Sequence, residues 1–289
     1  MLNSYVKKVP FKIIVLAKLF PLMEKLSTKL VVREAIKMFF RPIRYQIPGS
    51  ELKLRNKATI SYHNTSQNTI AVLQWESNKN APYVLLMHGW ASRSTHFKNF
   101  IESLLNQGFN VICPEAPGHG LSNGSKSDII RFAESIAVAH KMVTPKYWIG
   151  HSMGGSAAMY CINHFDCKPE HLSIIASPSI AFDILQVFTQ RLNISESLVP
   201  LMSKRIEYLY DGKKLKDYTA EYIIQRLPKD VSMNLVYDSK DTDAPVHHGE
   251  RLHELYPSAD LKITEKLGHV KIIKDLSVLN TCQKYWTSN

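Results

Sequence analysis

One short stretch near the middle of the chain requires a sharp change of direction between two regular elements. Residues 146–149 end an apolar run, and residues 153–165 are rich in small residues and have a helical pattern. Ser152 lies on the turn between them, with Gly150 and Gly154 two positions away on either side. Because these glycines carry no Cβ, the turn can be tight enough to expose the serine hydroxyl, at a conformational cost of about 1 to 3 kcal/mol. The stretch therefore predicts a strand, a strained turn and a helix.

The pattern Gly-x-Ser-x-Gly in this setting is a nucleophile elbow, which needs partners elsewhere in the chain. A serine hydroxyl is a weak nucleophile and requires a histidine base that a third group orients. His269 lies on a glycine-bearing loop after the last predicted strand, so we expect it at the same sheet edge as Ser152. His151 adjoins the serine, but adjacent residues at a turn point apart, so we expect it to support the catalytic groups rather than to be one of them. Three histidines on or near a predicted helix are expected at the surface: His247, His248 and His253.

The orienting acid is expected after the predicted strand at residues 233–237. Asp238, Asp241 and Asp243 all lie at this strand end, and their position alone does not choose among them. With any of the three, the chain order is serine, aspartate, histidine, which is the order of the α/β-hydrolase arrangement. The three signals together predict a catalytic triad.

A reaction at Ser152 also requires backbone N–H donors for the oxyanion. Met153 follows the nucleophile at the start of a predicted helix, where N–H groups have no intrahelical acceptor. The second donor is predicted at Trp90, in the loop "HGW" that follows the strand at residues 83–88. Gly89 in that loop allows the backbone to approach a bound carbonyl closely. We therefore predict an oxyanion hole formed by the N–H groups of Trp90 and Met153.

Apolar runs bounded by turn residues predict the framework that carries these loops. The expected strands are residues 58–63, 69–75, 83–88, 110–114, 147–151, 172–176, 233–237 and 261–264. The first two have no helix between them, whereas later strands alternate with helical segments such as residues 94–108. This order predicts an α/β fold with a mostly parallel sheet, an antiparallel edge and helices on both faces.

One segment interrupts the alternation. Residues 179–230 have a helical pattern without a convincing strand, and an insertion between core strands is positioned near the ligand-binding end of the sheet. We expect it to form a helical lid. The predicted organisation is therefore a basic helical arm at 1–45, a core at 46–178 and 231–289, and a lid at 179–230.

The net charge of +11 is concentrated near the N-terminus. Residues 1–60 hold 13 Lys and Arg against three Glu, which leaves the rest of the chain at +1. The apolar run at residues 11–22 is interrupted by two lysines and a proline, and it is shorter than the roughly 20 residues of a transmembrane helix. The arm can pack on protein or lie on an anionic membrane surface. Apolar residues around much of the helix at 22–40 favour packing on protein.

The cysteines give no sign of a metal site or a disulfide framework. Cys113, Cys161, Cys167 and Cys282 lack the spacing of zinc ligands and are expected as reduced thiols. No small-residue cleavage site follows the apolar run, so a secretory signal is not expected. We expect a cytoplasmic protein, with peripheral contact at the inner face of the membrane as an additional feature of the arm.

Five stretches together resemble the α/β-hydrolase superfamily: "LLMHGW", "CPEAPGHGLSNG", "GHSMGGSAA", "YDSKDTDAPV" and "LGHVKIIKD". The chain is most similar to bacterial single-domain hydrolases of the serine aminopeptidase, esterase and lysophospholipase-like group, over about residues 53–284. This resemblance implies Ser152 as nucleophile, His269 as base and Asp241 as acid. The family pattern has Val where this chain has Ala244. This departure leaves Asp243 as the alternative acid.

A second departure is Glu115, which stands where the family usually has Asp. His119 in the same loop is expected to have a structural role. The resemblance and the motifs predict a carboxylesterase-like or lysophospholipase-like serine hydrolase that cleaves an acyl, lipid-like ester or thioester through an acyl-enzyme. No cofactor, metal or nucleic acid is expected, and the partner is a small-molecule acyl ester. The alternative is a non-catalytic ligand-binding or interaction protein on the same fold.

Overall fold

The computed structural model describes residues 11–286, which divide into two compact units. The core unit comprises Pro42–Ile180 and Lys216–Asn289, and the helical unit comprises Met1–Arg41 and Ala181–Leu215. The first ten residues of the predicted basic arm lie outside the described residues. Each unit has a hydrophobic core of its own.

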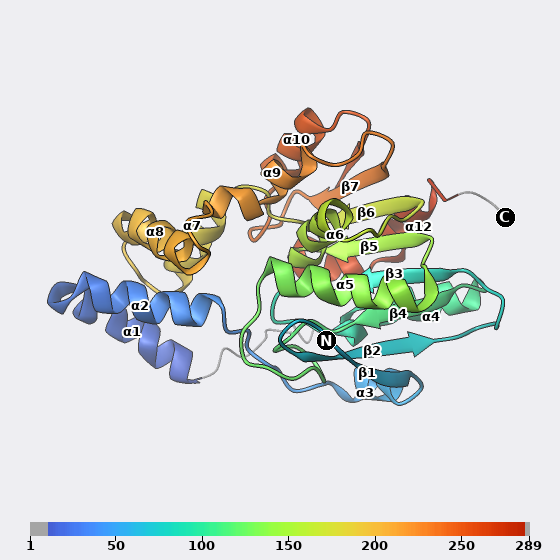
Figure 1. Cartoon of the computed structure of the whole chain (residues 1–289), viewed down its shortest axis with the longest axis horizontal. Coiled ribbons are helices and arrows are strands. Elements are labelled where there is room, and N and C mark those ends of the chain that lie inside the picture. Colours follow the sequence, from blue (N-terminus) through green and yellow to red (C-terminus); the bar gives the residue numbers. More distant parts are fainter. Residues whose placement is uncertain (1–10, 287–289) are drawn as a thin grey trace. The chain divides into compact units, whose positions relative to one another are not determined.

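An eight-stranded sheet forms the centre of the core unit (Figure 1). Its strands are β1 (Thr59–Asn64), β2 (Thr69–Trp75), β3 (Tyr83–Met87), β4 (Asn110–Pro114), β5 (Tyr147–His151), β6 (His171–Ile175), β7 (Ser232–Asp238) and β8 (Asp260–Thr264). They lie in the order β1-β2-β4-β3-β5-β6-β7-β8. β2 is antiparallel to both β1 and β4, and all other neighbours are parallel. The predicted mostly parallel sheet with an antiparallel edge is confirmed.

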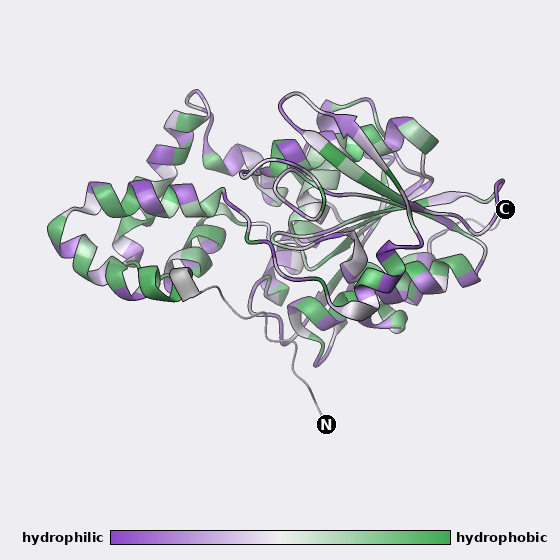
Figure 2. Ribbon diagram, turned by 90° about the horizontal axis from the view of Figure 1, so that it is seen from below, coloured by the Kyte–Doolittle hydropathy of each residue, from purple (hydrophilic) through white to green (hydrophobic). Residues whose placement is uncertain are grey.

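Burial explains why the central strands have continuous apolar sequences. Every residue of β4, β5 and β6 is buried, and parallel strands covered on both faces have no polar side to present to water. Figure 2 shows strands of the sheet running between helices, with hydrophobic stretches coloured green. The edge strand β1 instead alternates between exposed and half-buried residues, as expected for a strand that faces water on one side.

Helices cover the sheet on both faces (Figure 1). Those of the core unit are α3 (Gly49–Arg55), α4 (Lys98–Asn106), α5 (Ile129–Val143), α6 (Met153–His164), α9 (Ala220–Ile224), α10 (Val246–Leu255), α11 (Gly268–Lys271) and α12 (Leu276–Gln283). The core unit also contains the 3₁₀ helices η1 (Ser94–Phe97) and η4 (Ile272–Lys274), and η3 (Leu215–Tyr218) lies at the boundary between the two units in the sequence. α5, α6, α9 and α10 pack side by side in one layer, and α4 packs with α12 in the other.

The helical unit combines two segments that are far apart in the sequence. It contains α1 (Phe11–Leu26), α2 (Thr28–Phe39), α7 (Ala181–Arg191), η2 (Glu196–Leu198) and α8 (Val199–Leu209). Its core joins Phe20, Val31 and Ile36 of the arm to Leu185 and Met202 of the insertion, all of them buried. The apolar residues of the arm are therefore partly buried by the insertion helices.

The expected lid segment is divided between the two units. Residues up to Leu215 belong to the helical unit, whereas α9 packs against α6 and α10 in the core unit. Among the described residues, no helix is both long and apolar enough to cross a bilayer. All four cysteines are buried and form no disulfide.

Candidate active site

Ser152 lies between β5 and α6 in a strained backbone conformation. Its φ of 54° and ψ of −127° fall in a region that residues with a Cβ rarely adopt. A Cβ on Gly150 would lie 2.6 Å from the Cα of Gly155, and one on Gly154 would lie 2.3 Å from the carbonyl oxygen of Met87. The two glycines of the motif are therefore required by close backbone approach, and the structure has a strand, a strained turn and a helix at this place.

Three predicted residues from separate segments of the chain form one hydrogen-bonded chain. His269, in α11, directs Nε2 to the Oγ of Ser152 at 3.1 Å and Nδ1 to the Oδ2 of Asp241 at 2.7 Å. A proton on Nδ1 donates to the carboxylate, which leaves Nε2 free to accept from the serine hydroxyl. The side chain of Asp241 has no exposed surface, and that of His269 is 17% exposed. This is the geometry that a serine nucleophile, a base and an orienting acid need.

Backbone donors hold the carboxylate of Asp241 in this orientation. Its Oδ1 accepts hydrogen bonds from the N–H groups of Asp243 and Ala244, at 2.8 and 2.9 Å. The other oxygen faces His269. Asp243, the alternative acid, thus contributes through its backbone to the positioning of Asp241.

Asp238, the third candidate acid, holds the histidine loop. Its carboxylate accepts from the N–H groups of Leu267 and Gly268, and also from the Thr264 hydroxyl and the N–H of Lys240. Burial raises the pKa of Asp238, but these hydrogen bonds outweigh burial and hold the pKa below its ordinary value. Asp238 therefore fixes the backbone that carries His269.

The loop after β3 passes directly against the serine. A Cβ on Gly89 would lie 2.9 Å from the Cβ of Ser152, so only a glycine allows this approach. The backbone of Trp90 follows at once, while its indole stacks on Phe132 with ring centroids 6.3 Å apart. Met153 is the first residue of α6, where the N–H has no intrahelical acceptor. Both predicted oxyanion donors thus belong to segments that adjoin Ser152.

His119 supports this loop from the side. Its Nε2 accepts a hydrogen bond from the N–H of Ala91 at 3.1 Å, and its Nδ1 donates to the carbonyl of Pro117 at 3.0 Å. Burial, and the neighbouring His88, hold the pKa of His119 well below its ordinary value. The imidazole is therefore neutral near pH 7, which is the form that can accept from Ala91.

Two further residues stabilise the elbow and the base: Ser177, which the sequence did not single out, and His151, which was expected in a supporting position. Ser177, just after β6, donates from Oγ to the carbonyl oxygen of Ser152 at 2.8 Å. His151 donates from Nε2 to the carbonyl oxygen of His269 at 2.9 Å, and the two rings are 4.7 Å apart. The signal for Ser177 in the sequence was weak, since a small polar residue after a buried strand has many structural uses.

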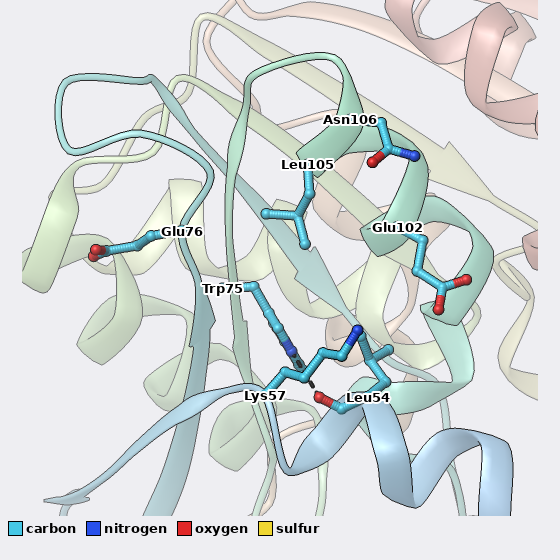
Figure 3. A pocket seen from close by; sticks show the side chains of 7 residues that line it. All are labelled: Leu54, Lys57, Trp75, Glu76, Glu102, Leu105 and Asn106. Atoms are coloured by element: carbon cyan, nitrogen blue, oxygen red, sulfur yellow. Dashed lines mark hydrogen bonds between the residues drawn. The ribbon is translucent and has the colours of Figure 1, made fainter.

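A separate surface pocket of about 410 Å³ lies away from these residues (Figure 3). Its lining comes from α3, the end of β2 and α4: Leu54, Lys57, Trp75, Glu76, Glu102, Leu105 and Asn106. The indole Nε1 of Trp75 donates to the carbonyl oxygen of Leu54 at 3.0 Å across one wall. No member of the hydrogen-bonded chain lines this pocket, so it is not the candidate active site.

Comparison with known proteins decides the family. The family model described as "serine aminopeptidase, S33" matches residues 78–235, which is more than half of the chain. The chain belongs to this family. The resemblance stated from the motifs is confirmed, and the protein is an α/β hydrolase by family and by fold.

Several individual relatives of this α/β hydrolase share low sequence identity with it. An uncharacterized protein of Mycobacterium tuberculosis is 22% identical over 66% of this chain and 70% of its own length. A pimeloyl-[acyl-carrier protein] methyl ester esterase of Vibrio vulnificus is 26% identical over 42% of this chain and 51% of its own length. An esterase of Pyrococcus furiosus has the same fold, with a TM-score of 0.66, 18% identity, and coverage of 86% of this chain and 98% of its own.

Proposed function

We propose that the protein is a serine hydrolase that cleaves a carboxylic ester or thioester through an acyl-enzyme intermediate. The observation that carries this proposal is the continuous chain from Ser152 Oγ through His269 to Asp241, with distances of 3.1 and 2.7 Å. A buried serine in a strained turn has no structural need for such partners. The esterase relatives are consistent with an ester substrate.

The proposed reaction has two halves. Ser152 Oγ attacks the carbonyl carbon as its proton passes to Nε2 of His269, and Asp241 stabilises the resulting imidazolium. The N–H groups of Trp90 and Met153 hold the oxyanion, and the leaving alcohol or thiol takes the proton from His269 as the acyl–oxygen or acyl–sulfur bond breaks. Water then gives a proton to His269 and attacks the acyl-enzyme, which releases the acid and returns the proton to Ser152.

We also propose an acyl, lipid-like substrate and a lid function for residues 179–230. The insertion begins after the carboxyl end of β6, which is the end of the sheet where ligands bind in open α/β folds. Its helices α7 and α8 carry many apolar residues. The fold and the triad predict chemistry on a small-molecule acyl ester without a cofactor.

Hydrolysis of p-nitrophenyl esters from two to sixteen carbons tests the proposal. We expect turnover by the wild type, a preference for medium or long chains, and loss of turnover by at least about 10⁴-fold in Ser152→Ala. Ser103→Ala, which changes a half-buried serine of α4 whose hydroxyl accepts from the Gln107 side chain, is the matched control and should retain activity. A folded wild type that binds acyl compounds without turning over any ester or thioester would support the non-catalytic alternative and overturn the proposal.

A further inference from the structure

The outer side of α1 (Phe11–Leu26) carries a group of exposed apolar side chains. Five large side chains are exposed, and Leu22 and Leu26 are exposed by 58% and 81%. The five fall within one side of an α-helix at 100° per residue: Ile14, Val15, Leu19, Leu22 and Leu26. Isolated exposed leucines are common on protein surfaces, but five on one helical face form a patch typical of an interaction site.

The charge beside this face is positive. Lys18 and Lys25 are exposed, and at 100° per residue both lie on this same outer side, between Ile14 and the group formed by Leu22, Val15, Leu26 and Leu19. The helical unit, 1–41 with 181–215, holds fourteen Lys and Arg and six Asp and Glu. Its net charge of +8 accounts for most of the +11 of the chain. An exposed apolar group with lysines beside it on the same side of a helix complements an anionic lipid surface.

The opposite side of α1 is fixed to the helical unit. Phe20 is fully buried in the unit's core. Pro21 has no N–H to donate to the carbonyl oxygen of Ala17, and the side chain of Asn193 donates to it instead, at 3.4 Å. The backbone N–H of Ser195 donates to the carboxylate of Glu24 at 3.2 Å. These contacts hold the helix by its inner side and leave the outer face directed away from the unit's core.

We infer that the outer face of α1 docks the protein on an anionic membrane surface, with the helix axis in the plane of the interface. The leucines enter the boundary between headgroups and acyl chains, and Lys18 and Lys25 contact lipid phosphates. This inference concerns the helical unit and does not depend on the reaction at Ser152. It assigns the basic arm a defined surface and a lipid partner.

Co-sedimentation with vesicles tests the inference on the full chain. One set of vesicles is phosphatidylcholine, and the other is an equal mixture of phosphatidylcholine and phosphatidylglycerol. We expect stronger binding to the mixed vesicles, weakened by salt. The double variant Leu22→Glu/Leu26→Glu should lower the partition coefficient at least about tenfold. The control Ile60→Glu/Tyr62→Glu makes the same charge change at exposed positions of β1 and should bind much as the wild type does.

A second pair of variants separates charge from apolar contact. Lys18→Gln/Lys25→Gln should weaken binding to mixed vesicles by about fivefold for each lysine and have little effect on phosphatidylcholine vesicles. The control Lys53→Gln/Lys79→Gln removes two exposed lysines of the core unit. This control should bind the mixed vesicles more strongly than Lys18→Gln/Lys25→Gln does.

Two results would overturn the inference. One is a wild type that stays in the supernatant with both vesicle types, or α1 variants that sediment as their controls do. The other is a wild type that dimerises without lipid and becomes monomeric in Leu22→Glu/Leu26→Glu, which would assign the face to a second copy of the chain. Each variant is also assayed for hydrolysis of p-nitrophenyl acetate, and we expect the wild-type rate from all of them. This assay separates the test of membrane binding from the test of the proposed activity.

Discussion

At the scale of single residues, Asp241 and Asp243 are two carboxylates in one turn with different surroundings. Asp241 contacts Nδ1 of His269, and the backbone N–H of Asp243 donates to Asp241. Asp241→Asn should lower kcat by about 10⁴-fold, because the amide favours the wrong histidine tautomer. Asp243→Asn preserves that backbone donor and should retain most of the activity. Steady-state kinetics of both variants with one ester decide the acid, and the reverse order of effects would assign the role to Asp243.

Asp238 gives a prediction about stability and pH. Its folded-state pKa lies below the ordinary value, so its carboxylate stabilises the fold fully above about pH 4, the unfolded pKa. This contribution falls as the pH drops through the lower folded-state pKa. Asp238→Asn should cost about 1 to 3 kcal/mol at pH 7, because an amide nitrogen would face backbone donors. Urea unfolding from pH 7 down to pH 3 should show the difference from wild type shrinking in acid; a constant difference would contradict this account.

At the scale of elements, the elbow depends on the close approach of α6 to β3. A Cβ on Gly154 would lie 2.3 Å from the Met87 carbonyl oxygen, whereas a Cβ on Gly49 would meet nothing within 4 Å. Gly154→Ala should therefore destabilise the protein by about 3 kcal/mol or more and abolish turnover. Gly49→Ala, at the start of α3, should be neutral or slightly stabilising. Thermal unfolding compares the two, and equal midpoints would show that the elbow can relax.

The oxyanion loop gives a second prediction at this scale. His119→Ala removes the acceptor for the N–H of Ala91, one residue beyond Trp90. We expect kcat to fall by about ten- to a hundredfold, less than the 10²- to 10³-fold loss typical when a donor itself is removed. KM should change little, and unfolding should remain cooperative. His253→Ala, whose imidazole contacts Ala259, is the control. An unchanged kcat would mean that the loop holds its position without His119.

At the scale of the whole molecule, the arm and the insertion share one core. Val31 in α2 is fully buried there, whereas Lys29 on the same helix is exposed. Val31→Asp buries an unpaired charge and should loosen the helical unit, so that trypsin cleaves within residues 181–215 although the substitution is at residue 31. Lys29→Asp should leave the digestion pattern close to that of the wild type. Cleavage confined to the arm in Val31→Asp would show that the two segments are independent.

The sequence predicted the parts that have local signals. All eight strands were predicted from apolar runs between turn residues. The order of strands and helices along the chain also predicted that Ser152 and His269 lie at the same end of the sheet, beyond the carboxyl ends of the strands. The choice of Asp241 required a resemblance, because three aspartates lie at or just after the end of β7 and only their contacts distinguish them. The shared core of the helical unit joins segments more than a hundred residues apart, and no local pattern reports such a contact.

Labelling with a fluorophosphonate probe tests the central claim, that Ser152 is an activated nucleophile, most directly. The probe forms a covalent bond to a serine oxygen that a histidine base deprotonates, and peptide mass spectrometry locates it. We predict modification of Ser152 in the wild type, loss of labelling in Ser152→Ala and strong slowing in His269→Gln. Both variants should unfold cooperatively. Labelling of another serine, or a folded wild type that does not label, would contradict the account.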